Sequence, residues 1–124
     1  MGTSGNASES LIRITIEDRL PASVARVSGE VDVTSAPRLQ AELFRLIAEG
    51  RPVILDLADV SYFDLAGVRA IEAVAAGNGA SVVLASAPRA VIRILEIVWP
   101  ESPVRVLHSV NEAIAHLTGG GDRP

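Results

Sequence analysis

Short apolar runs alternate with longer amphipathic segments along most of this chain. The apolar runs are of strand length and rich in branched residues, and they occupy residues 11–16, 23–28, 53–57, 81–86 and 104–107. The longer segments repeat apolar residues every three or four positions, and they occupy residues 35–49, 65–76, 89–98 and 110–117. Alternation of these two patterns is typical of α/β domains.

The first two strand-like runs differ from the later ones in what separates them. Between them Arg19–Ala22 supplies a turn and no helical segment intervenes, which predicts an antiparallel pair. Each later run follows a helical segment, which predicts parallel strands. The sequence therefore predicts an α/β fold with a small, mainly parallel sheet, an N-terminal antiparallel strand pair and about four covering helices.

Helix-capping residues and apolar helix faces support this assignment. The residues expected to cap helices are Thr34 or Ser35, Asp64, and Ser109 together with Glu112. The predicted buried stripe of the third helix consists of Val91, Ile92, Leu95 and Val98. Each helix has one apolar side, so we expect each to cover the sheet with that side only.

Length and composition indicate one domain with an apolar core. The chain has 124 residues, of which 48% are hydrophobic, and no cysteine. Disulfides, thiol nucleophiles and cysteine-ligated metals are therefore excluded. We expect residues 1–10 to be a disordered N-terminal lead, residues 11–118 to form the domain, and residues 119–124 to be a flexible tail.

The charged residues narrow the range of partners. All 11 of the Lys and Arg residues are arginines, scattered from Arg13 to Arg123, and the net charge is -4. Because nucleic-acid binding requires clustered cations, this pattern argues against it. A phosphate-binding loop that ends in Gly-Lys-Ser/Thr is excluded because the chain has no lysine. No apolar run approaches the length of a membrane span, so we expect a cytoplasmic protein without membrane insertion.

No group of residues predicts catalysis, metal binding or a cofactor. The two histidines, His108 and His116, lie on either side of the start of the last predicted helix and are not expected to converge. Ser61 lacks the glycine-flanked turn that positions the nucleophilic serine of hydrolases. We therefore expect a protein that is not an enzyme and needs neither a metal ion nor a cofactor.

Two loops are candidate binding sites, because each leaves a strand and enters a helix. Residues 29–35 and 61–68 would both emerge at the carboxyl end of the sheet, where ligands and partners of parallel α/β folds usually bind. Glu30, Asp32 and Asp64 would lie there. A purely structural interpretation remains open, in which these residues only cap a helix or permit a turn.

Two stretches of the sequence, each of which contains one of these loops, suggest a family. They read GEVDVTSAPRL at residues 29–39 and VILDLADVSYFDLAGV at residues 53–68. In order and spacing they resemble the STAS domain of bacterial anti-sigma factor antagonists, and the resemblance covers roughly Leu11 to Leu117. It implies a STAS-like fold and a partner-switching function. In that function the antagonist binds an anti-sigma factor, an ATPase-like serine kinase, and so frees a sigma factor.

The resemblance also implies a partner-binding surface and a switch. The matched residues are Gly29, Glu30, Asp32, Thr34, Ser35, Asp64, Leu65, Ala66, Gly67 and Val68. In the family the kinase phosphorylates a Ser or Thr directly after the Asp of the second motif, and the phosphoprotein releases its partner. Here that position is Leu65, which cannot accept a phosphate, and Ser61 is the nearest alternative acceptor. An antagonist of this kind would be constitutive or regulated in another way.

Other roles remain open at this stage. STAS domains also serve as scaffolds or as subunits of transporter and stress-signalling assemblies. A small-ligand or nucleotide-binding domain would use the helix N-termini near Asp32 and Asp64, although acidic residues there argue against it. Leu65 would either meet a partner or simply pack against its own domain. The sequence also leaves open the sigma pathway, whether the domain dimerises, and whether Trp99 belongs to the core.

Overall fold

The computed structural model describes residues 12–78 and 81–119. These residues form five strands and four helices, in the order β1 (Ile12–Arg19), β2 (Ala22–Val31), α2 (Ala36–Ala48), β3 (Val53–Phe63), α3 (Leu65–Asn78), β4 (Val82–Ala85), α4 (Arg89–Val98), β5 (Val106–Leu107) and α5 (Val110–Leu117). None of the described helices has the length and apolarity that crossing a bilayer requires. The predicted N-terminal lead and nearly all of the predicted tail lie outside the described residues.

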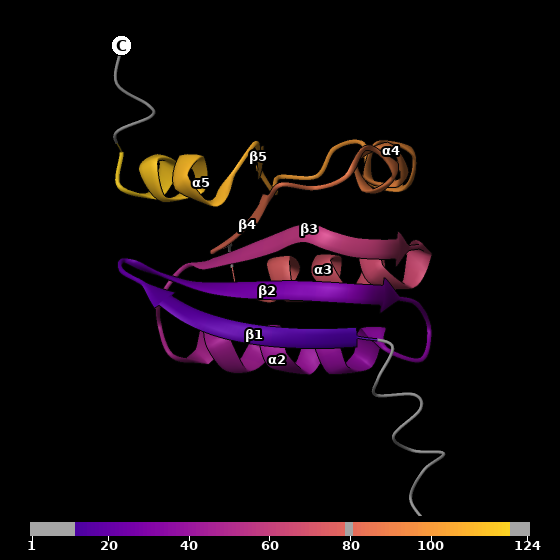
Figure 1. The fold of residues 1–124 in the computed structure, drawn as a ribbon, viewed down its shortest axis with the longest axis horizontal. Helices are drawn as coiled ribbons and strands as arrows, with labels where there is room; N and C mark the ends of the chain where they lie inside the picture. The colour runs from indigo at the N-terminus through magenta and orange to yellow at the C-terminus, as the bar shows by residue number, and fades with distance from the viewer. Residues whose placement is uncertain (1–11, 79–80, 120–124) are drawn as a thin grey trace, which may run out of the picture.

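The strands form one mixed sheet in the order β1-β2-β3-β4-β5. β1 runs antiparallel to β2, and all later neighbours are parallel. Figure 1 shows β1 and β2 side by side with opposite arrowheads, whereas the arrowheads of β2 and β3 point the same way. The predicted fold class is confirmed, including the antiparallel pair and, within the described residues, the four helices.

The first three strands extend beyond their predicted ends. Only Leu20 and Pro21 separate β1 from β2, so the predicted turn is shorter than expected. β3 continues through Phe63, and Ser61 therefore lies within a strand and not in a loop. Ser61, which was expected to begin the loop, is exposed, as is Asp59 before it. A strand with one face in solvent tolerates such residues, which is why composition misplaced its end.

Helix α2 shows how apolar periodicity determines packing. Leu39, Leu43 and Leu46 are buried on its inner side, and burying each such leucine contributes about 1.5–3 kcal/mol. Pro37 lies in the first turn, where its missing N–H costs no hydrogen bond. Gly50 follows the helix with a φ of 90°, a left-handed conformation that favours glycine. These local signals fix both ends of the helix.

Helix α4 departs from its predicted buried stripe. Val91 and Leu95 are buried and Ile92 is half-buried, but Val98 is 39% exposed. Val98 is the last residue of the helix, and Trp99 directly after it packs against the core instead. Trp99 is half-buried. The end of the helix thus meets the core through Trp99 and not through Val98.

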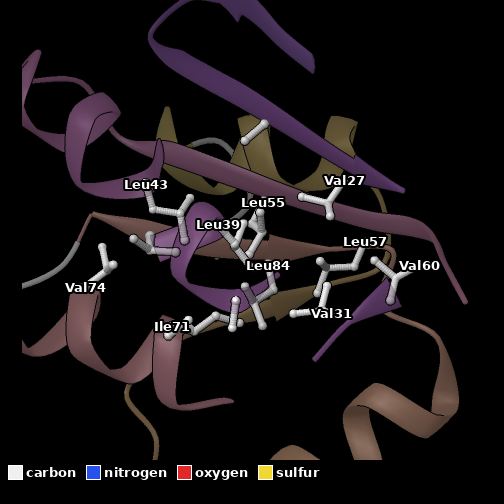
Figure 2. Close-up of a cluster of buried hydrophobic side chains, with 14 of the residues drawn as sticks. Val27, Val31, Leu39, Leu43, Leu55, Leu57, Val60, Ile71, Val74 and Leu84 are labelled. Carbon is white, nitrogen blue, oxygen red and sulfur yellow. The ribbon is translucent and has the colours of Figure 1, made fainter. Parts of the chain in front are cut away.

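The core lies on both faces of the sheet. The larger cluster joins the sheet to α2, α3 and α4, and Figure 2 shows its side chains, among them Leu55, Ile71 and Leu84, gathered between strands and helices. The smaller cluster packs Ala113 of α5 against Val24 and Ile54 on the opposite face. The two layers hold the sheet rigid beneath the loops that follow β2 and β3.

Two irregularities in β3 set the register at the carboxyl end of the sheet. Relative to β2, β3 has one additional residue between Asp56 and Asp59 and another between Val60 and Tyr62. Gly29, opposite the second bulge on β2, has a φ of 98°, a conformation that glycine adopts without strain. The bulges bring Tyr62 opposite the end of β2.

Candidate protein-binding site

The carboxyl ends of β2 and β3 carry both motif segments. β2 leads through Asp32–Ser35 into α2, and β3 leads through Asp64 alone into α3. We call these two connections the first and the second link. The backbone N–H of Asp64 donates to the carbonyl oxygen of Val31 at 3.3 Å, so the two links lie side by side. They are found at the end of the sheet to which the arrowheads of β2 and β3 point in Figure 1.

The side chain of Asp32 organises the first link. Its Oδ1 accepts hydrogen bonds from the Thr34 hydroxyl at 2.7 Å and from the backbone N–H groups of Thr34 and Ser35 at 2.9 and 3.1 Å. These bonds, above all the one from the Thr34 hydroxyl, hold the pKa of Asp32 below its ordinary value. Asp32 therefore carries a negative charge at neutral pH, on a link that its own hydrogen bonds keep in place.

The prediction that Thr34 or Ser35 caps helix α2 with its side chain is wrong. Ser35 occupies the N-cap position, but its hydroxyl accepts no helix N–H. That hydroxyl donates to the carbonyl oxygen of Glu30 at 2.7 Å and accepts the N–H of Asp32 at 3.0 Å. The charged carboxylate of Asp32 is the stronger acceptor for the N–H groups of Thr34 and Ser35. Ser35 is only 2% exposed and supports the link from beneath.

Asp64 caps helix α3, as predicted. Its Oδ1 accepts the N–H of Ala66 at 2.9 Å, and its Oδ2 accepts the Tyr62 hydroxyl at 3.2 Å. This hydrogen bond and the negative charge of Asp64, with smaller effects from Asp32 and Glu30, raise the pKa of Tyr62 above its ordinary value. Carboxylates from both links therefore raise the pKa of the same phenol hydroxyl.

Tyr62 is a site residue that the sequence pattern did not reveal. It was expected in a loop, whereas it lies on β3 opposite Glu30 and is 50% exposed. One signal was available, because Tyr62 precedes Asp64 by two residues. In an extended chain that spacing directs two side chains to the same side.

Exposed apolar side chains lie on the same two links as the carboxylates. Val33 in the first link is 75% exposed, and Leu65, the first residue of α3, is 42% exposed. The side chain of Leu65 is therefore only partly covered by its own domain. We call the combined surface the acidic-apolar surface, and it consists of Glu30, Asp32, Val33, Tyr62, Asp64 and Leu65.

An open groove between α2 and α3 continues the acidic-apolar surface. It has a volume of about 510 Å³ and is lined mostly by apolar side chains, among them Val33 and Ala66 next to the links and Phe44 further along α2. Phe44 is 38% exposed. Arg69 lines the same groove. An apolar centre with charged residues at its rim is the composition of many protein interfaces.

Two of the matched residues act from inside the fold. Val68 is fully buried. Gly67 lies against the ring of Phe63, where an added Cβ would come within 2.7 Å of Cζ. The absence of a side chain at Gly67 lets α3 approach the end of β3 this closely. Gly67 and Val68 therefore position α3 beneath the acidic-apolar surface.

Comparison with known proteins agrees with this geometry. The family model of the STAS domain matches residues 13–113 of the chain. The chain belongs to the STAS-domain family. In this STAS domain the two motifs form the adjacent links whose backbones bond at Val31 and Asp64.

Solved structures share the fold of this STAS domain at low sequence identity. An anti-sigma factor antagonist from Mycobacterium paratuberculosis has a TM-score of 0.74 and 22% identity, with 86% of this chain and 94% of that chain covered. The Bacillus cell fate determinant SpoIIAA in its phosphorylated form has a TM-score of 0.64 and 17% identity, with coverages of 85% and 99%. The murine anion transporter Slc26a9 has a TM-score of 0.68 and 15% identity, with 83% of this chain but 18% of the transporter covered. At these identities the likeness shows the fold alone.

The position after Asp64 distinguishes this STAS domain from the pattern of switchable antagonists. Leu65 stands there and has no hydroxyl to accept a phosphate. The alternative acceptor, Ser61, is exposed on β3, within a paired strand. The first residue of α3 therefore presents an apolar side chain beside the carboxylate of Asp64.

Proposed function

We propose that this STAS domain is a non-catalytic anti-sigma factor antagonist. It binds an ATPase-like serine-kinase anti-sigma factor and thereby frees a sigma factor, in the cytoplasm where transcription takes place. The observation that carries the proposal is the acidic-apolar surface, in which both matched motifs meet at one end of the sheet. The fold shared with the antagonist from Mycobacterium paratuberculosis supports it.

The charges of the acidic-apolar surface favour a protein partner over a nucleotide. Helix N-termini attract anions, but at α2 and α3 the carboxylates of Asp32 and Asp64 already accept the nearby N–H groups. A nucleotide phosphate would meet their negative charge. Arginine or lysine side chains of a partner would be attracted instead. The exposed side chains of Val33 and Leu65 would then be buried at the centre of the interface.

Leu65 removes the phosphate switch from this surface. A phosphate at the start of α3 would add up to about two negative charges beside Asp64 and oppose a close-packed partner. Leu65 instead presents a side chain that is 42% exposed, and burying that exposed part contributes about 1 kcal/mol to binding. Binding through this surface is therefore constitutive with respect to the family's phosphorylation position.

The proposal is tested by capture from a lysate of the source cells. Wild-type bait should retain a protein that mass spectrometry identifies as an ATPase-like anti-sigma factor. Val33→Arg should abolish this capture, because it places a large cation at the apolar part of the surface. Ile97→Arg is the matched control, since Ile97 on α4 is 74% exposed and Val33 is 75% exposed.

Two outcomes would contradict the proposal. Equal capture by wild type, Val33→Arg and Ile97→Arg would place the binding face elsewhere. Capture of transporter or scaffold components in place of an anti-sigma factor would assign this STAS domain to a different assembly. A melting curve of each variant serves as the control for unfolding, and all variants should melt cooperatively like the wild type.

A further inference from the structure

A cleft opens between α4 and the segment that leads from α4 into β5. It has a volume of about 830 Å³, within the range of sites that bind small molecules. We call it the α4–β5 cleft. It adjoins β4 and β5, whereas the acidic-apolar surface lies on β2 and β3. Among the described residues that line the cleft, none belongs to that surface.

The walls of the α4–β5 cleft are mostly apolar. On one side are Ile92 and Leu95 of α4 and Trp99 directly after it, and on the other side are Val104 and Val106. Val106 is 42% exposed, and Ile92, Trp99 and Val104 are half-buried. These side chains therefore leave apolar area in contact with water inside a concave site. Covering that area favours a ligand with an apolar body.

One end of the cleft is polar and held by hydrogen bonds. Ser86 and His108 lie there, directly after β4 and β5. The Ser86 hydroxyl donates to the carbonyl oxygen of His108 at 3.3 Å, and the N–H of His108 donates to Glu112 Oε1 at 3.1 Å. This end thus lies at the carboxyl ends of two parallel strands, a usual place for ligands in α/β folds.

Arg89 supplies a cation at the same end of the cleft. It is the first residue of α4 and lines the cleft together with Ser86 and His108. Its guanidinium forms neither a hydrogen bond nor an ion pair with any residue in the described part of the chain. Arg26 and Arg45, in contrast, are each paired with two carboxylates. Arg89 is therefore available to bind an anionic group bidentately.

A single acidic side chain, Glu96, also lines the cleft among the described residues, two helical turns after Arg89. Its charge would repel an anion nearby, so the Arg89 end is the favourable place for an anionic group. We propose that the α4–β5 cleft binds a small amphiphilic carboxylate. The carboxylate lies at Arg89 and His108, and an aromatic or branched apolar body lies against Ile92, Trp99 and Val106.

The ligand pair phenylbutyrate and phenylbutyramide tests this proposal, because the two probes differ only in the charge of one end. Trp99 is the chain's only tryptophan, so its fluorescence reports occupancy of the cleft directly. Phenylbutyrate should change that fluorescence saturably and bind about tenfold more tightly than the amide, since a charge-assisted bond to Arg89 is lost in the amide. Amide NMR signals of Ser86, Arg89 and His108 should shift with the same dissociation constant.

Arg89→Gln and Arg93→Gln form a matched pair of variants. Both remove one positive charge from α4, but Arg93 does not line the cleft. Arg89→Gln should remove the preference for the carboxylate, whereas Arg93→Gln should retain it. Equal binding of the two probes to wild type, equal effects of the two variants, or no saturable binding of phenylbutyrate would each overturn the proposal. Anti-sigma factor capture by Arg89→Gln should be unchanged, so the cleft and the acidic-apolar surface are tested separately.

Discussion

Arg26 Nε lies 2.9 Å from Asp56 Oδ2, joining β2 to β3 on the face of the sheet that packs against α5. The Asp56 side chain is 8% exposed, and its other oxygen accepts the N–H of Ala58 at 3.1 Å. Ala58 lies within the first bulge of β3. The ion pair therefore fixes the point at which β3 changes register, upstream of Tyr62 and Asp64.

Arg26→Gln should lower the free energy of unfolding. The substitution leaves the nearly buried Asp56 carboxylate without its cation, a loss that costs about 1–3 kcal/mol. Because the Arg26 side chain is 42% exposed, we expect a value in the lower half of that range. Urea unfolding measures it. Arg45→Gln is the control, since its pairs with Glu42 and Glu49 are more exposed and should contribute less to stability than the Arg26 pair. Equal losses in both variants would contradict a special role for the Asp56 pair.

The ionisation of Tyr62 should report the charge of Asp64. The chain has a single tyrosine, so the ultraviolet absorbance of tyrosinate follows this residue alone. Its pKa is raised in the folded state by the hydrogen bond to Asp64 and by that residue's charge. The interaction therefore stabilises the fold below about pH 10 and is lost as the pH rises through the raised pKa.

Asp64→Asn should lower the midpoint of that titration, because it removes the charge and keeps an oxygen for the N–H of Ala66. Asp18→Asn, an exposed change on β1, should leave the midpoint unchanged. If both variants titrate like the wild type, the effect of Asp64 on Tyr62 is absent in solution.

The stabilising contribution of Asp32 to the fold should be lost in acid. Its pKa is lowered in the folded state, chiefly by the Thr34 hydroxyl, so the folded protein binds this proton more weakly than the unfolded chain. The stabilisation is fully present above about pH 4 and is lost as the pH falls through the lowered pKa. Asp32→Asn should therefore flatten the acid side of a plot of melting temperature against pH. A plot parallel to that of wild type, or the same flattening in the exposed variant Asp59→Asn, would refute this assignment.

The parts of the fold that sequence predicts well depend on local signals. The periodic leucines of α2 and the cap at Asp64 involve residues within one or two helical turns, and both are found as predicted. The same holds for Ser109, whose hydroxyl accepts the N–H of Glu112 at 3.0 Å. The connections after β2 and β3 are found where the alternation of strand and helix patterns predicts them, but they are shorter than the expected loops and consist of residues 32–35 and of Asp64.

The parts that sequence predicts poorly depend on contacts between elements. Pairing with β2 sets the length of β3, and the composition of residues 61–63 does not reveal this pairing. Val98 lacks its predicted burial at the end of α4, and Trp99 directly after it packs against the core. The groove beside Val33 exists only because α2 and α3 pack next to each other. Such features require the tertiary arrangement before they can be recognised.

Gly67→Ala should destabilise the fold, although alanine is the better helix former. An exposed Gly to Ala change within a helix gains about 1 kcal/mol, but here the new Cβ would lie 2.7 Å from Phe63 Cζ. Overpacking of this kind costs about 1–3 kcal/mol, so a net loss is expected in urea unfolding. Phe63→Leu should reduce that loss when combined with Gly67→Ala, because it withdraws the clashing ring. A stabilised Gly67→Ala protein would show that the ring moves aside without cost.

Leu65→Ser restores a hydroxyl directly after Asp64, where the family's kinase acts. With the captured anti-sigma factor and ATP, this variant should gain a phosphate by intact-mass analysis and then release its partner, while wild type gains none. Leu65→Ala is the control, because it removes the same apolar side chain without adding a hydroxyl. It should stay unmodified and bind up to about fivefold more weakly than wild type, since the contribution of the buried leucine side chain, about 1 kcal/mol, is lost from the interface. If wild type is phosphorylated as readily as Leu65→Ser, another acceptor exists, and Ser61 on β3 is the first to replace.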